Sequence, residues 1–501
     1  MRFIEPKYLF VFITMIYFSN NCFCQNTDQV SPRYNVTLKE AHIGSFEIDT
    51  MLLNSYETLP SNITSFYLDA RAVFEKNKVD LTDIQIVEAA TKNNIRLMGG
   101  PMLGDVKENG ISIWFRPSNE LPIHIKVIAL NSNEENSYTL KPVAAGKAQR
   151  IVINDLSPST NYKYVVLSQD IKIAEGAFQT APKTDENTQL RLTFGSCFHK
   201  IGLHNPNLIN TILKRKTNAM LLLGDIAVDD RENNFNMHSS DYLLRDVSQS
   251  WKKLAANVAL YTSWDDHDYL NNDLSGIPEN FTEQEREELR TLWRQNWNNP
   301  QNNAEGIYFT TRIGQVEIIM LDTRSCRKIE ERGEYGSYLG SEQQKWLKSI
   351  LKNSTAPFKI ISSGTMWSDY ITNGKDSWGT WDTLAREEIF NLIEEENIPG
   401  VLLISGDRHG ARGFTIPETS GFKFYEFEAA SLGGVPGPPA MAKDTSNQLF
   451  GYHGEGLKAF GEFTFNTEEN KPQVTFRLID EFGNVMEKHI LSYDMLTPKK
   501  Q

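Results

Sequence analysis

Apolar and polar positions follow different patterns in successive parts of this chain. In residues 64–76 and 81–93 the apolar positions recur at intervals of three and four, which predicts helices. Between residues 111 and 178 they alternate with polar positions over short runs, as in 111–115, 124–128 and 150–153, which predicts β-strands. From residue 190 onward, short apolar runs alternate with longer amphipathic stretches. That arrangement indicates an α/β region whose strands are buried by helices.

Within the α/β region we expect strands at 190–194, 220–223, 258–261, 316–321, 358–361 and 401–404. Two pairs, Thr282 with Glu285 and Ser341 with Gln344, have the spacing of capping boxes and predict helix starts. Residues 461–493 alternate like two strands joined by 480–484. We expect this hairpin to close a sandwich of sheets.

The length of 501 residues indicates more than one domain. We expect a signal peptide over 1–24, a partly helical extension over 25–95, a β-sandwich over 96–182 and a catalytic domain over 188–495, with 181–188 as a linker. The stretch 156–164 places Leu156, Pro158, Thr160, Tyr162 and Tyr164 at alternate positions, which resembles a fibronectin-type sandwich. Nothing in the extension indicates its chemistry.

The N-terminus has the pattern of an export signal. An apolar run from 8 to 18 is too short to span a bilayer, and polar residues 19–21 follow it. Cys22 and Cys24 lie three residues and one residue before Gln25, which predicts cleavage there; lipid attachment to one of these cysteines is the alternative. No later run is long and apolar enough to cross a membrane. We therefore expect an exported protein, in the periplasm, on the cell surface or outside the cell.

The charge of the chain limits the kinds of partner that the protein can have. A net charge of -13 and a pI near 5.3 argue against nucleic acid as a dedicated partner, because such a partner favours clustered Lys and Arg. Loss of the signal leaves Cys197 and Cys326, which could pair in an oxidising compartment. Because Cys197 follows a strand, we favour a metal-ligand role for it. Cys326 receives no role, and the oligomeric state stays open.

Reactive side chains follow the strands of the α/β region: Cys197, Asp225, Asp266, His267, Asp407 and His409. The carboxyl ends of strands in layered α/β sheets form a rim where ligands bind, so we expect these side chains to gather there. Carboxylate, imidazole and thiolate together suit iron or zinc beside a harder divalent ion. Two or three such ions would polarise a phosphoryl group and generate hydroxide near neutral pH.

These motifs resemble those of the PhoD-like alkaline phosphatases, within the calcineurin-like metallophosphoesterase superfamily. The matching segments are 194–197, 223–225, 264–269, 321–324 and 405–409. The resemblance implies a sandwich of sheets flanked by helices and the hydrolysis of small phosphate monoesters or diesters. It also implies iron and calcium as cofactors, with zinc, manganese or magnesium as alternatives.

The resemblance carries roles for single residues. It implies metal ligands at Cys197 as a thiolate, Asp225 as a bridging carboxylate, Asp266, Asp407 and His409. His267 would protonate the leaving group. Arg324 would contact phosphate, with a structural salt bridge as the alternative. Asn272 would contact metal or phosphate.

The sequence departs from the family pattern after Asp225. The family often has a tyrosine three residues further on, where a phenolate can bind ferric iron, but this chain has Val228 there. Asp229 and Asp230 follow and are candidates to replace it. The departure leaves the identity of the metal open and favours one alternative to an enzyme, a surface binding protein whose site is degenerate. A phosphodiesterase or phospholipase with the same metals is a separate alternative, which substrate size would decide.

Overall fold

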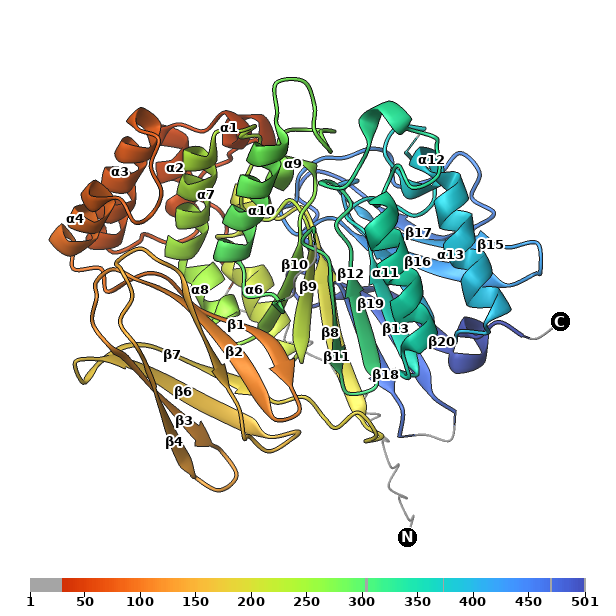
Figure 1. Cartoon of the computed structure of the whole chain (residues 1–501), viewed down its shortest axis with the longest axis horizontal. Coiled ribbons are helices and arrows are strands. Elements are labelled where there is room, and N and C mark those ends of the chain that lie inside the picture. Colours follow the sequence, from red (N-terminus) through yellow and green to blue (C-terminus); the bar gives the residue numbers. More distant parts are fainter. Residues whose placement is uncertain (1–28, 302–304, 373, 469–470, 500–501) are drawn as a thin grey trace, which may run out of the picture.

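The computed structural model describes residues 29–301, 305–372, 374–468 and 471–499. The predicted signal peptide, residues 1–24, lies outside the described residues. Figure 1 shows N-terminal helices and two antiparallel sheets on one side of the molecule, beside two larger sheets that are flanked by helices. Among the described helices, none has the length and apolar character needed to cross a membrane.

The N-terminal extension packs against the α/β region. Helix α1 (Leu38–Ile43) begins with a capping box and is followed by α2 (Phe46–Leu53). The helices predicted at 64–76 and 81–93 are confirmed as α3 (Ser61–Lys76) and α4 (Ile84–Lys92). Apolar residues of these helices share a buried core with α7 (Phe235–Val247). The extension is therefore fixed to the α/β region by burial of apolar surface.

Residues 97–179 form antiparallel sheets with the orders β1-β2-β5 and β4-β3-β6-β7. Strand β2 is buried on both faces, because Ile113 and Phe115 point into the core between these sheets while Trp114 packs into the α/β region. The Trp114 indole N–H donates to the Gln295 carbonyl at 3.0 Å. The strands are β1 (Leu97–Lys107), β2 (Gly110–Pro117), β3 (Ile123–Ala129), β4 (Glu135–Leu140), β5 (Gln149–Ile153), β6 (Asn161–Ser168) and β7 (Ile171–Gln179).

Two larger sheets form the centre of the α/β region. The first, here called the β9 sheet, has the order β10-β9-β8-β18-β19-β20, and the second, the β13 sheet, has the order β11-β12-β13-β14-β16-β15-β17. The strand bounds are β8 (Gln189–Gly195), β9 (Ala219–Leu223), β10 (Ala259–Ser263), β11 (Phe309–Ile313), β12 (Val316–Met320), β13 (Phe358–Ser362), β14 (Val401–Ser405), β15 (Ala411–Pro417), β16 (Lys423–Ala429), β17 (Gln448–Tyr452), β18 (Ala459–Asn466), β19 (Gln473–Asp480) and β20 (Val485–Ser492). All the strands predicted from residue 190 onward are present.

Alternate side chains of each strand point into different layers. Ile318 of β12 lies in the core between the two sheets, whereas the adjacent Ile319 packs under the helices on the outer face. The same alternation separates Leu221 from Leu222 in β9. The order of layers is helix, sheet, sheet, helix. The outer helices are α6 (Pro206–Lys214), α8 (Gln249–Ala255) and α10 (Glu283–Asn296) on the β9 sheet, and α11 (Gly340–Asn353) and α13 (Thr383–Glu395) on the β13 sheet.

Three local predictions have different outcomes. The capping box of Thr282 and Glu285 is confirmed at the start of α10. The one at Ser341 is wrong, because α11 already begins at Gly340 and no side chain caps it. Gln344 instead donates to the Ala385 carbonyl at 3.0 Å and joins α11 to α13. The prediction for 461–493 was incomplete, because this segment contains most of β18 as well as the β19–β20 hairpin.

Candidate metal centre

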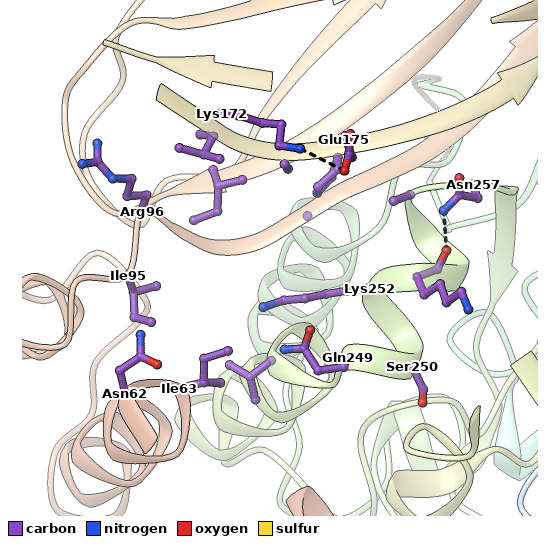
Figure 2. A pocket seen from close by; sticks show the side chains of 18 of the residues that line it. Asn62, Ile63, Ile95, Arg96, Lys172, Glu175, Gln249, Ser250, Lys252 and Asn257 are labelled. Atoms are coloured by element: carbon purple, nitrogen blue, oxygen red, sulfur yellow. Dashed lines mark hydrogen bonds and ion pairs between the residues drawn. The ribbon is translucent and has the colours of Figure 1, made fainter. Parts of the chain in front are cut away.

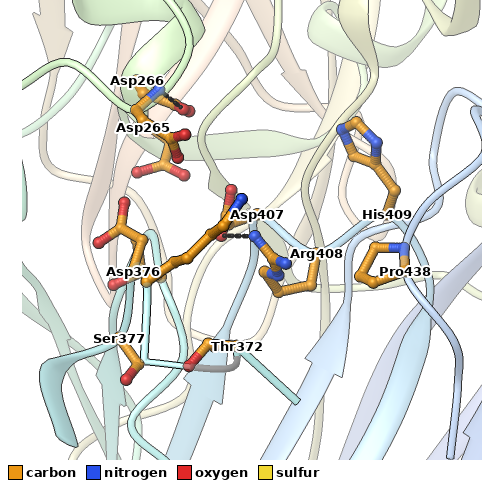
Figure 3. A network of polar contacts seen from close by, with 12 residues as sticks. Asp265, Asp266, Thr372, Asp376, Ser377, Asp407, Arg408, His409 and Pro438 are labelled. Atoms are coloured by element: carbon orange, nitrogen blue, oxygen red, sulfur yellow. Dashed lines mark hydrogen bonds and ion pairs between the residues drawn. The ribbon is translucent and has the colours of Figure 1, made fainter. Parts of the chain in front are cut away.

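The predicted site residues lie just beyond the carboxyl ends of strands. Cys197 follows β8 and Asp225 follows β9, while Asp266 and His267 open the short helix α9 (Asp266–Tyr269) after β10. These three parallel strands belong to the β9 sheet. Asp407 and His409 follow β14 of the β13 sheet. Figure 3 shows Asp265 and Asp266 on one side of Asp407 and His409 on the other. The centre is therefore shared between the two sheets.

Potential ligand atoms within 4.8 Å of one another form overlapping groups. One group contains Cys197, His199, Asp225 and His409; a second contains Asp225, Asp266 and His267; a third contains Asp265, Asp266 and Asp407. Asp225 joins the first group to the second, and Asp266 joins the second to the third. All six strand-end residues that the sequence singled out thus belong to one connected centre.

His199 belongs to this centre although the sequence analysis did not single it out. Its Nδ1 donates to Asp229 Oδ1 at 2.8 Å, and the Nδ1 of His409 donates to the Pro436 carbonyl at 2.9 Å. Burial lowers the pKa of both imidazoles, that of His409 to about 3. Each ring is therefore neutral and carries its proton on Nδ1, so that both Nε2 atoms present lone pairs. These Nε2 atoms lie 3.2 Å from each other.

The carboxylates of the centre are buried and only partly satisfied. Within the described part of this centre, one oxygen of each of four carboxylates has no hydrogen-bond donor: Asp225 Oδ1, Asp265 Oδ2, Asp266 Oδ1 and Asp407 Oδ2. Burial raises the pKa of Asp225 and Asp407 well above their usual range and that of Asp265 to about 7. Buried carboxylate oxygens without hydrogen-bond donors and two opposed imidazole lone pairs favour cations between them. The donor set therefore fits metal ions.

His267 has a different electrostatic environment from His199 and His409. Its Nδ1 donates to Asp230 Oδ1 at 2.7 Å. Burial alone would lower its pKa, but the carboxylates of Asp266, Asp225 and Asp230 hold the pKa of His267 well above its usual range. The same carboxylates favour a second proton, on Nε2. This is the protonation state that a general acid needs.

A match to a protein-family model decides the family of this chain. A family model described as PhoD-like phosphatase matches residues 211–486, which is more than half of the 501-residue chain. The chain belongs to the PhoD-like phosphatase family. The family resemblance stated from the sequence motifs is thereby confirmed.

Individual relatives agree with this assignment. Alkaline phosphatase D of Bacillus subtilis (strain 168) is 23% identical over 337 residues, which are 59% of this chain and 54% of that protein. The match thus spans about half the length of this curated relative. A solved structure titled "Structure of PhoD" has a TM-score of 0.63 at 18% identity, with 79% of this chain and 88% of that chain covered. Purple acid phosphatase PPD1 from yellow lupin (Lupinus luteus) seeds has a TM-score of 0.59 at 14% identity, with 79% and 75% covered. These two structures share the mixed α/β fold.

Five residues of the PhoD-like site share an uncommon backbone conformation. Cys197 (φ 56°), His199 (φ 45°), Asp225 (φ 54°), Asp407 (φ 75°) and His409 (φ 39°) all have left-handed backbones. Residues other than glycine rarely adopt this region, and such strain concentrates at functional sites. Asp268 supports the turn after β9, because its carboxylate accepts the backbone N–H groups of Asp225 and of the next two residues.

Arg324 and Asn272 lie at the edge of the PhoD-like centre. Arg324 is fully buried, and its guanidinium pairs with Asp265, with Asp376 at 2.7 Å and with Asp266 at 3.6 Å. This geometry favours the salt-bridge alternative, and a contact with phosphate stays a prediction. The Asn272 side chain donates to Asp273 at 2.9 Å, and its role as a ligand also stays a prediction.

Neither cysteine of the described chain is in a disulfide. Cys197 is buried with its Sγ 3.4 Å from Asp225 Oδ2, whereas Cys326 contacts the Arg290 guanidinium at 3.5 Å. Burial, together with Asp225, raises the pKa of the Cys197 thiol. A bound cation would offset that effect, because metal coordination deprotonates a thiol.

A separate groove lies away from this centre. It encloses about 860 Å³ between the N-terminal helices, β7 and α8 (Figure 2). Lys172 pairs with Glu175 on one wall, and Lys252 extends from the opposite wall. The described residues that line it include none of the candidate ligands, so the groove is not the reaction site.

Proposed function

We propose that this protein is a metal-dependent phosphoesterase that hydrolyses phosphate monoesters and also diesters. The observation that carries the proposal is the pair of unprotonated imidazole nitrogens of His199 and His409, set 3.2 Å apart beside buried carboxylates whose oxygens lack donors. Family membership supports the reaction class.

The donor set divides into a softer and a harder half. Cys197, His199 and His409 supply sulfur and nitrogen, which suit iron or zinc. Asp265, Asp266 and Asp407 supply oxygen, which suits calcium, magnesium or manganese. Asp225 shares one ligand group with the softer half and another with Asp266 of the harder half, so its carboxylate would join the two halves. When bound, two or three such ions polarise a phosphoryl oxygen and acidify water.

The protein's own side chains complete the chemistry. Hydrolysis transfers a water oxygen to phosphorus, breaks the bond to the ester oxygen and requires one proton on the departing oxygen. His267 supplies that proton from Nε2, because Asp230 occupies its Nδ1. Arg408 is better placed than Arg324 to contact phosphate: its side chain is 17% exposed and 3.6 Å from Asp407, whereas Arg324 is enclosed. Its guanidinium can donate to phosphate oxygens.

The same proposal covers export and domain organisation. We infer that the chain is exported and that residues 188–495 form its catalytic domain. The seven strands of the described residues 97–179 and their two-sheet order support a fibronectin-type module over 96–182. The acidic net charge supports a small phosphate ester over nucleic acid as the substrate.

Two other functions compete with this proposal. A phosphodiesterase or phospholipase would use the same residues, and only substrate size would distinguish it. A degenerate binding protein would not need the unsatisfied carboxylate oxygens of the centre, which cost stability unless cations bind there. The intact ligand set therefore favours an enzyme.

The test is hydrolysis of p-nitrophenyl phosphate and bis(p-nitrophenyl) phosphate, with metal content measured on the same samples. The wild type should turn over at least one ester and carry metal, and Asp225→Asn should lose both. Asp170→Asn, an exposed carboxylate in the β6–β7 turn, is the matched control. A metal-loaded wild type that cleaves neither ester would overturn the phosphoesterase proposal for these substrates. Failure to hold metal after reconstitution would support the binding protein.

A further inference from the structure

The N-terminal extension places one side chain inside the centre. His42, in the last turn of α1, lies between Asp229 and Asp230 although it precedes them by a large part of the chain. Its Nδ1 is 3.0 Å from Asp230 Oδ2, and its Nε2 is 3.7 Å from Asp229 Oδ1. Its ring also lies 4.6 Å from that of His267, measured between centroids. The extension thus contributes directly to the site region.

The backbone of His42 is held by contacts that do not involve its own side chain. Thr37 and Glu40 cap the start of α1, and Gly44 ends it with φ 61°. The Arg231 guanidinium donates to the His42 carbonyl at 3.1 Å and is itself fixed by Asp241 at 2.7 Å. A side chain at Gly44 would collide with this guanidinium, because an added Cβ would lie 2.8 Å from Arg231 Nη2. The helix end therefore presents His42 in a fixed place.

The His42 ring connects two otherwise separate histidine–carboxylate pairs. Asp229 orients His199, the candidate ligand, and Asp230 orients His267, the candidate acid. His42 lies between these two neighbouring carboxylates and contacts both. The result is a continuous chain of side chains in the order His199, Asp229, His42, Asp230, His267.

The two carboxylates depend on His42 to different degrees. Asp229 also accepts the Lys200 backbone N–H at 3.2 Å, and its contact with His42 is the longer one. Asp230 is 22% exposed in its side chain and is held by His42 at 3.0 Å and by the Asn272 backbone N–H at 3.0 Å. Loss of His42 would therefore free Asp230, and with it His267, more than it would free Asp229.

We propose that His42 is a positioning residue that holds Asp230, and through it the proton-donating His267, in the orientation for protonation of the leaving group. The inference rests on the proposed phosphoesterase function. On this proposal the N-terminal extension contributes a side chain that the reaction needs, in addition to packing against the α/β region.

The test compares His42→Ala with two variants that each restore one contact. The amide nitrogen of Asn can take the place of Nδ1 toward Asp230, and that of Gln the place of Nε2 toward Asp229. The substrates are an alkyl phosphate, whose leaving oxygen needs a proton, and p-nitrophenyl phosphate, whose leaving group does not. General acid catalysis contributes about 10²- to 10⁴-fold. We expect His42→Ala to lower kcat for the alkyl ester by about 10- to 100-fold and for the nitrophenyl ester by less than about 3-fold.

His42→Asn should restore most of the kcat for the alkyl ester that His42→Ala loses, whereas His42→Gln should not. Metal content should match that of the wild type in all three variants. His124→Ala, which removes a histidine from strand β3, is the control. Equal losses for both esters, or no loss, would overturn the proposal. Loss of a metal equivalent from His42→Ala would also overturn it, because His42 would then be a ligand.

A second readout does not depend on turnover. In ¹⁵N-histidine-labelled protein, the Nδ1 proton of His267 should give a downfield resonance that disappears in His42→Ala and returns in His42→Asn. A resonance that is unchanged in His42→Ala would exclude the positioning role. If the wild type cleaves no phosphate ester, the proposed function fails while this measurement still decides whether His42 holds His267.

Discussion

The Nε2 atoms of His199 and His409 face each other across 3.2 Å, and a hydrogen bond from each Nδ1 leaves neither Nε2 with a proton. A cation between these lone pairs would make both atoms ligands. His199 would then supply an imidazole to the centre, while Val228, at the position where the family often has a tyrosine, lies in the apolar core.

The first prediction concerns His199 as a ligand. His199→Ala should weaken metal binding by at least about 100-fold, because loss of a residue that only orients a ligand costs about 10- to 100-fold. Asp229→Asn, which removes the carboxylate that orients His199, should weaken metal binding by that smaller factor. Metal titration checks both points; unchanged metal binding by His199→Ala would refute the ligand role.

Metal removal should destabilise the protein. The ligands come from both central sheets, so bound ions join the sheets at one rim and also neutralise buried carboxylates. Binding to the folded state at about 1,000 times Kd contributes about 4 kcal/mol, which corresponds to roughly 5 °C or more in Tm. Scanning calorimetry with and without a chelator measures the shift. The Tm of Asp225→Asn should change little when the chelator is added. A change equal to that of the wild type would show that the chelator acts on metal bound elsewhere.

Replacing Arg324 should lower the stability of the protein, whereas replacing Arg408 should weaken its binding of substrate. Arg324→Met leaves the buried Asp265 without its cation, whereas Asp376 keeps Arg327 at 2.8 Å, so we expect a loss of about 3 to 5 kcal/mol in the free energy of unfolding. Arg408→Ala should barely change stability but raise KM for a phosphate ester by about 10-fold or more, because a hydrogen bond to a charged group is worth about 1.5 to 3 kcal/mol. Denaturant titrations and steady-state kinetics separate the two. The reverse pattern would restore Arg324 as the phosphate contact.

Acid stability should depend on His204. Its side chain is buried, and among the described residues its Nε2 has no hydrogen-bond partner. Burial lowers its pKa to about 3, so between about pH 6.5 and 3 the unfolded chain binds a proton that the folded protein excludes. Stability therefore falls with decreasing pH in this window, by up to about 1.4 kcal/mol per pH unit from this residue. Urea titrations at pH 7 and pH 5 should show a smaller decrease for His204→Gln; an identical decrease would exclude His204 as a source.

Much of the central fold was predictable because its strands are short apolar runs buried on both faces. The predicted run 220–223 is within one residue of β9. Strand β1 was missed because Gly99 and Pro101 are typical of a strand boundary, yet β1 continues past them through register shifts at Gly99 and Met102. Helix α1 was missed because six residues are too few to show helical periodicity.

The candidate site was predictable where chemistry follows a strand. Cys197 and His199 follow β8 with the same two-residue spacing that Asp407 and His409 have after β14, so His199 could have been found from the sequence. His42 could not, because only the docking of the extension against the α/β region brings it to Asp230. No local pattern encodes that contact.

The left-handed backbones of the candidate ligands also restrict how this site could change over evolutionary time. Among residues other than glycine, Asn, Asp and His tolerate this conformation best, and β-branched side chains tolerate it worst. Ligand positions such as Asp225 and Asp407 could therefore drift to glycine or asparagine more readily than to valine or isoleucine. A relative that has lost its metals would still show the shape of the old site in its sequence, as glycine or asparagine at the ends of the same strands.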